Sequence, residues 1–139
     1  MDVYWPGISE QQLEGQPAFS DDGHAWGNWM AEREGAPEVL QTVIDLGAAP
    51  ILTVMTDGWG DEDVAWVTPQ ELRGAAQQLR RAVQHHGPRV SRPLEVYARH
   101  ANPVDLVADQ FLADLADIEA LTLWAEREGA SKMTLRVNW

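Results

Sequence analysis

Residues 94–137 decide the fold, and they read LEVYARHANPVDLVADQFLADLADIEALTLWAEREGASKMTLRV. Within this stretch, Asn102 followed by Pro103 is a helix-start signal, because asparagine caps free N–H groups and proline fits the first helical turn. We predict a long helix over 103–128. Apolar residues at steps of three and four form its buried side; they are Val104, Val107, Phe111, Leu115, Ile118 and Leu121.

A strand flanks this helix on each side. Residues 94–99 alternate between apolar and polar side chains, as a half-buried strand does. Residues 133–137 form a second strand after Gly129, the glycine at which we expect the helix to end. The order strand, helix, strand predicts a right-handed parallel crossover.

A second amphipathic helix precedes this unit. Thr68 is an N-cap residue, Pro69 suits the first helical position, and Glu71 is placed to complete a capping box. Gly87 stops the helix. The spacing predicts one apolar face, consisting of Leu72, Ala76, Leu79 and Val83.

A hairpin is predicted before that helix. Residues 50–56 are rich in β-branched side chains and bounded by turn residues, which indicates a strand, and residues 64–67 indicate another. The acidic loop 57–63 between them predicts an antiparallel hairpin at 50–67.

The N-terminal third has weaker signals. We expect a short strand at 2–5, irregular chain over 7–22, and two short helices that end at Gly35 and Gly47. Together the elements predict an α+β fold in a single globular domain over 1–139. Its mixed β-sheet of about four to five strands contains the hairpin, and helices pack on it, including the long one.

Charge is distributed unevenly along the chain. Residues 1–63 carry thirteen acidic side chains and one basic one, Arg33. Residues 64–101 hold six arginines against two glutamates, and we interpret these arginines as neutralising acidic segments within the fold. The net charge of −12 argues against a nucleic-acid partner, because phosphates would repel the protein.

Several functional classes lack their sequence signals. The chain has no cysteine, which excludes disulfides, thiolate zinc sites and a cysteine nucleophile. It has no signal-peptide pattern, no bilayer-spanning apolar run, no phosphate-binding glycine loop and no serine in a nucleophile elbow. We expect a cytoplasmic protein with no cofactor and no membrane partner, and a binding protein rather than an enzyme. The preference for arginine over lysine is typical of GC-rich bacterial genomes.

The acidic loop 57–63 is a candidate for a hard divalent cation, which oxygen ligands would hold. The calcium-loop pattern fails, however, because Trp59 and Glu62 occupy positions where a carboxylate and a glycine are needed. We therefore predict a solvated hairpin tip and no metal site.

The long helix carries a second acidic surface. A helical wheel places Asp105, Asp109 and Asp117 opposite the apolar side, with Trp124 among them. Asp105 and Asp109 are four residues apart and repel one another, so helix stability does not explain them. The face is either an ordinary solvated one or a docking surface for a basic partner, with Trp124 as its aromatic anchor.

Three tryptophans have an ambiguous setting. Trp26, Trp29 and Trp59 have acidic or glycine neighbours rather than an apolar run. They can be core residues, interface residues, or rings on which a sugar or a cation stacks.

These observations favour an acidic binding protein that masks a basic protein partner, as a toxin-immunity protein or a similar inhibitor does. Charge would steer the association, and tryptophan burial would stabilise it. The predicted partner-binding residues are Trp26, Trp29, Asp57, Trp59, Asp61, Glu62, Asp63, Asp105, Asp109, Asp117 and Trp124. The alternative is a small enzyme or ligand-binding domain with a site around His24, Trp26, Asp57 and Trp59.

Overall fold

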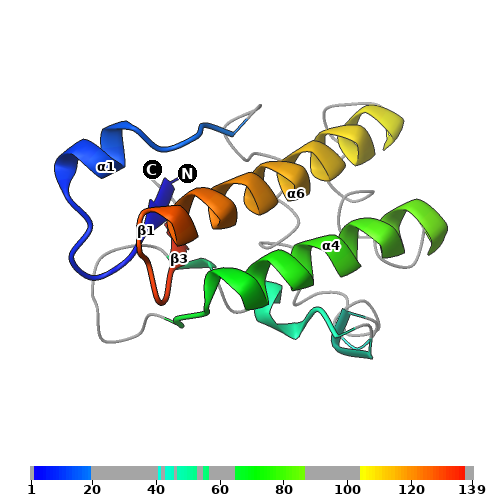
Figure 1. The fold of residues 1–139 in the computed structure, drawn as a ribbon. Helices are drawn as coiled ribbons and strands as arrows, with labels where there is room; N and C mark the ends of the chain where they lie inside the picture. Colours follow the sequence, from blue (N-terminus) through cyan, green and yellow to red (C-terminus); the bar gives the residue numbers. More distant parts are fainter. Residues whose placement is uncertain are drawn as a thin grey trace.

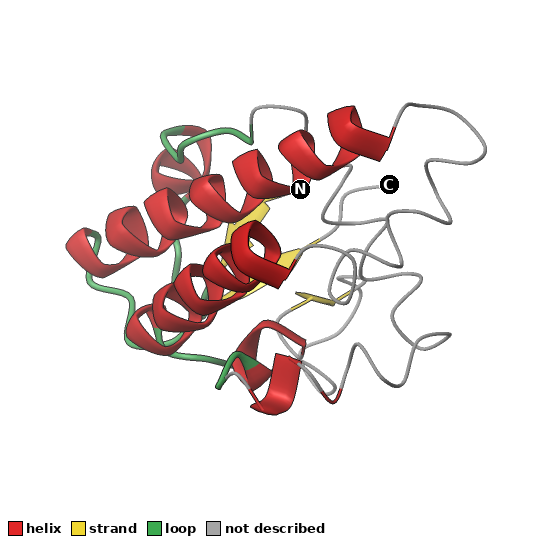
Figure 2. Ribbon diagram, turned by 90° about the vertical axis from the view of Figure 1, so that its right-hand side faces the viewer, coloured by secondary structure: helices red, strands yellow, loops and turns green. Residues whose placement is uncertain are grey.

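The computed structural model shows two long helices packed beside a small sheet (Figure 1). The helices α4 (Pro69–His86) and α6 (Val104–Arg127) lie side by side, and the strands lie behind them in this view. In Figure 2, turned by 90°, the strands lie near the middle of the view and are partly covered by the helices. The structure describes residues 2–19, 41, 43–45, 47–52, 55–56, 65–86 and 104–136.

Helix α4 confirms the prediction at both its start and its buried face. Thr68 Oγ1 accepts a hydrogen bond from the Glu71 N–H at 3.1 Å, and Glu71 Oε2 accepts one from the Thr68 N–H at 3.0 Å. These reciprocal bonds satisfy two N–H groups that a helix start otherwise leaves free. The apolar face is buried, as predicted, through Leu72, Ala76, Leu79 and Val83.

Helix α6 confirms the long helix that was predicted over 103–128. It ends before Gly129, whose φ of +88° is the left-handed conformation that favours glycine. The Ala130 N–H then donates to the Ala125 carbonyl at 2.9 Å, which closes the helix end. The predicted core residues whose side chains are described are all buried: Phe111, Leu115, Ile118 and Leu121.

Two ion pairs join α4 to α6. Arg73 Nη1 lies 2.6 Å from Glu126 Oε2, and Arg80 Nη1 lies 2.6 Å from Glu119 Oε2. The arginines are seven residues apart on α4, and their glutamates are seven apart on α6 in the reverse order. Seven residues make about two turns, so the helices run antiparallel with both pairs on one side. For these two arginines, the predicted neutralisation of acids within the fold is confirmed.

The sheet has three strands in the described residues, in the order β1-β3-β2. Strand β1 (Asp2–Tyr4) is antiparallel to β3 (Thr134–Arg136), and β2 (Met55–Thr56) is parallel to it. Val3 lies opposite Leu135, and both side chains are fully buried in the core. The mixed α+β class agrees with the prediction.

The predicted sheet of four to five strands is wrong, and so is the hairpin at 50–67. Ala49–Leu52 form a 3-10 helix, η2, that contacts α4, and Ile51 is fully buried. Strand β2 pairs with β3, while Val67 forms its bridge with Met133, so the described arms do not pair with each other. A short apolar run indicates burial, but it does not distinguish a strand from a tight helical turn.

A short helix, α1 (Glu10–Glu14), lies in the stretch 7–22 that was predicted to be irregular. Ser9 Oγ accepts from the Gln12 N–H at 3.1 Å, and Gln12 Oε1 accepts from the Ser9 N–H at 3.0 Å. This capping box is a sequence signal for a helix start, and it stabilises a helix of only five residues.

Gly47 ends a helical segment, as predicted. Its φ is +76°, and the Ala48 N–H donates to the Val43 carbonyl at 3.0 Å. The strand predicted at 94–99 and the helix predicted to end at Gly35 lie outside the described residues.

Candidate functional site

Most of the predicted partner-binding residues lie outside the described part of the chain. His24 of the alternative site lies there too, and the side chain of Asp105 on α6 is not described. The other undescribed residues are Trp26, Trp29, Asp57, Trp59, Asp61, Glu62 and Asp63. The structure therefore places three of the predicted residues, namely Asp109, Asp117 and Trp124.

The two acids of this group occupy different sides of α6. Asp109 is exposed and Asp117 is half-buried. Eight residues at about 100° each separate their directions by about 80° around the helix. They therefore do not form a single row of carboxylates along α6.

The predicted position of Trp124 among the exposed acids is wrong. Only 8% of Trp124 is exposed, and its ring packs against Trp5 with the centroids 5.3 Å apart and a tilt of 55°. A tilted contact between two aromatic rings is favourable, and burying an indole removes a large apolar area from water. The helical wheel places Trp124 correctly away from the centre of the core, but a wheel contains no information about the segment that packs beside it.

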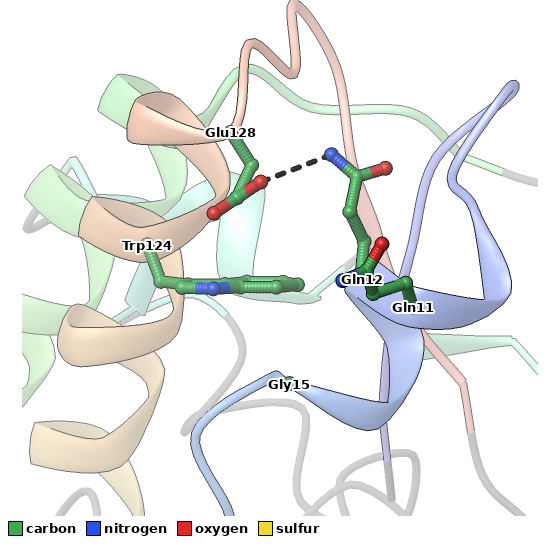
Figure 3. Close-up of a pocket in the computed structure, with 5 residues that line it drawn as sticks. All are labelled: Gln11, Gln12, Gly15, Trp124 and Glu128. Atoms are coloured by element: carbon green, nitrogen blue, oxygen red, sulfur yellow. Dashed lines mark hydrogen bonds between the residues drawn. The ribbon is translucent and has the colours of Figure 1, made fainter.

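Trp124 instead lines a pocket between α1 and the C-terminal end of α6. The pocket has a volume of about 410 Å³ and is lined by Gln11, Gln12, Gly15, Trp124 and Glu128. In Figure 3 the indole extends from α6 toward α1, with Glu128 on one side of the ring and Gly15 on the other. An aromatic ring, a carboxylate and two amides therefore meet in one cavity.

Gln12 fixes the carboxylate of this pocket. Its Nε2 donates a hydrogen bond of 3.0 Å to Glu128 Oε2 (Figure 3), while its Oε1 accepts from the Ser9 N–H. One side chain therefore caps α1 and orients Glu128, which is 116 residues away in sequence. The amide contributes no charge, so Gln12 orients the Glu128 carboxylate without providing an ion-pair partner.

The pocket has the chemistry of a site for a cation. The face of an indole attracts a positive charge, and a carboxylate beside it adds a direct ion-pair partner. Glu10 and Glu14 on the adjacent α1 are both exposed and add to the negative potential near the opening. In the described residues, no three histidine, aspartate or glutamate side chains converge as a metal site requires.

Three residues of the pocket were not predicted from the sequence, namely Gln11, Gln12 and Glu128. One signal was available, because Ser9 followed by Gln12 matches the capping-box pattern and predicts the start of α1. No local pattern places that helix beside residues 124–128, because the two segments meet only in the folded chain.

Comparison of the chain with protein families, with curated proteins and with solved structures finds no match. No helix in the described ranges combines the length and the apolar character needed to cross a bilayer.

Proposed function

We propose that this protein binds a basic protein partner and masks it, and that the pocket at Trp124 receives one lysine or arginine side chain of that partner. The observation that carries the proposal is the placement of the Glu128 carboxylate beside the indole in an open cavity. A long cationic side chain can lie along the ring with its charged end at the carboxylate.

The distribution of charge supports an acidic binding surface. Among the described basic side chains, Arg73 and Arg80 pair with glutamates, and Arg136 pairs with Asp2 at 3.2 Å. Lys132 lies 4.9 Å from the centroid of the Trp66 ring. Acids, by contrast, remain exposed on α1 and α6. The net charge of −12 would steer a basic partner toward the protein.

The test is a titration with two probes that differ only in charge. Nα-acetyl-arginine amide and Nα-acetyl-citrulline amide are added to the ¹⁵N-labelled protein, and the indole N–H signal of Trp124 is followed by NMR. The signal is assigned from its absence in Trp124→Phe. We expect the arginine probe to shift it, with weak affinity that falls as salt is added, and the citrulline probe to leave it unchanged.

Two variants separate the pocket from the bulk negative charge. Glu128→Gln should weaken binding of the arginine probe by about two- to fivefold, as expected for loss of one partly exposed ion pair. Glu14→Gln removes the same charge from α1 outside the pocket lining and should have a smaller effect. Equal effects of the two variants, or equal binding of the two probes, would contradict the proposed site.

The proposal for the whole protein is tested with basic peptides. A panel of peptides of equal length, rich in arginine and lysine, is compared with the same panel after lysine acetylation and arginine replacement by citrulline. Binding to the basic panel that falls with salt and with Glu128→Gln supports the masking function. Preference for the neutralised panel contradicts it and favours a neutral ligand in the pocket.

A further inference from the structure

The outward face of α6 is unusually apolar for a face turned away from the core. Asp109, Ala120, Leu123 and Arg127 are exposed along it, and Leu123 is 49% exposed. Ala113 and Ala116 are half-buried. We call this set the outer stripe; its members are Asp109, Ala113, Ala116, Ala120, Leu123 and Arg127.

The other sides of α6 already have partners. Glu119 and Glu126 pair with α4, and Trp124 and Glu128 face the pocket beside α1. At about 100° per residue, the outer stripe centres opposite Ile118, which is fully buried in the core. It is therefore the side of α6 that no described element covers.

The positions of the outer stripe are spaced symmetrically about position 118. Asp109 and Arg127 each lie nine residues from it, and carry opposite charges. Ala116 and Ala120 each lie two residues from it. If a second α6 lies antiparallel across the stripe, each Asp109 meets an Arg127 at both ends, and alanine meets alanine near the centre.

The sizes of the side chains fit the same arrangement. Ala113 and Leu123 each lie five residues from position 118, so antiparallel pairing sets a large side chain against a small one. The steps along the stripe are four, three, four, three and four, which is the heptad spacing of helices that pack at about 20°. Alanine allows the two helix axes to approach closely.

We propose that the outer stripe is a docking surface for a second copy of this chain, with the two α6 helices antiparallel about a two-fold axis beside position 118. A two-fold interface needs a patch complementary to itself, and the reversed order of Asp109 and Arg127 provides this complementarity of charge. The proposal does not depend on the pocket at Trp124, which lies on a different side of α6.

The interface is small, so the dimer is weak. From Asp109 to Arg127 the stripe is about 27 Å long at 1.5 Å per residue, and one helix pair buries less area than a standard protein interface. The net charge of −12 on each chain also opposes association at low salt. We expect a monomer–dimer equilibrium at micromolar to millimolar concentrations.

Sedimentation velocity tests this equilibrium from about 10 μM to about 1 mM protein in about 150 mM NaCl. The wild-type protein should show concentration-dependent dimerisation. Ala120→Glu should weaken it by roughly tenfold or more, because each copy would then place a carboxylate against Ala116 of the other copy in the apolar centre. Gln78→Glu adds the same charge at an exposed position of α4 and should leave dimerisation unchanged.

Charge exchange identifies the register. Asp109→Arg alone and Arg127→Asp alone should each lose self-association, because like charges would meet at both ends of the dimer. An equimolar mixture of these two variants should form heterodimers, and the double variant D109R/R127D should recover wild-type association. Circular dichroism checks that each variant keeps its helices.

Three outcomes overturn the proposal. The first is a monomer at every concentration, and the second is a dimer that Ala120→Glu leaves intact. The third is a failure of both the mixture and the double variant to restore association, which would show that Asp109 does not meet Arg127. Weaker binding of the arginine probe to Glu128→Gln does not test the dimer, because Glu128 is not part of the outer stripe.

Discussion

Two glycines illustrate how the backbone conformation of a single residue decides the effect of a substitution. Gly129 has a φ of +88°, and no atom lies within 4 Å of the position a Cβ would take. Gly129→Ala should therefore destabilise the protein through backbone strain alone, by about 1–2 kcal/mol. Urea unfolding measures the change in the free energy of unfolding.

Gly74 is the matched control for that substitution. It lies within α4, and a Cβ there also meets no atom within 4 Å. Gly74→Ala should stabilise the protein by about 0.4–1 kcal/mol, because alanine has less conformational freedom to lose on folding. If both substitutions changed stability in the same direction, backbone conformation would not be the cause.

The contact between α4 and α6 makes stability depend on pH at Glu126. The hydrogen bond from Arg73 holds the pKa of Glu126 below its ordinary value of 4.5, and a hydrogen bond from Gln70 acts in the same direction. A lowered pKa in the folded state adds stability that is present above 4.5 and is lost as pH falls through the lowered pKa.

Glu126→Gln should therefore lower the urea midpoint at neutral pH, and its difference from wild type should shrink toward zero as the pH is lowered below 4.5. Arg73→Gln removes the main cause of the pKa shift. In that background Glu126→Gln should have little further effect, as a double-mutant cycle requires for a direct pair. A difference that stays constant from neutral to acid pH would contradict the assignment.

Elements with local signals could be predicted from sequence, and those that depend on distant partners could not. Helices α4 and α6 have their start and stop signals, such as Thr68 and Gly129, within a few residues of their ends. The run that contains Ile51 has the composition of a strand, but its packing under α4 produces a 3-10 turn. The end of the same run, Met55–Thr56, pairs with β3, which lies about eighty residues further along the chain.

At the scale of the whole molecule, the net charge of −12 acts on folding as well as on binding. Repulsion among the acids opposes the compact state, and added salt screens it. The thermal midpoint should rise by about 2–5 °C between about 10 mM and about 150 mM NaCl. Differential scanning calorimetry measures this change.

A variant with fewer exposed acids should respond less to salt. Glu10 and Glu14 are both exposed on α1, and replacing both with glutamine removes two negative charges. The rise of the midpoint with salt should be smaller in this variant. A midpoint that falls with salt would instead show that ion pairs such as Arg80–Glu119 outweigh the repulsion.

The candidate site could be predicted in part only. The excess of acids and the number of tryptophans were evident from composition, and Trp124 was among the predicted binding residues. Its cavity could not be predicted, because residues 11–15 and 124–128 come together only through the packing of α1 on α6. The hydrogen bond between Gln12 and Glu128 spans 116 positions of sequence, far beyond the range of any local pattern.

The strand order also has a consequence for the time course of synthesis. Strands β1 and β2 both pair with β3, which is the last of the three to be translated. Until residues 134–136 leave the ribosome, neither earlier strand can form its pairing with β3, whereas the capping box of α4 can form from neighbouring residues. The emergence of β3, rather than the speed of helix formation, therefore determines when a nascent chain can acquire its native sheet.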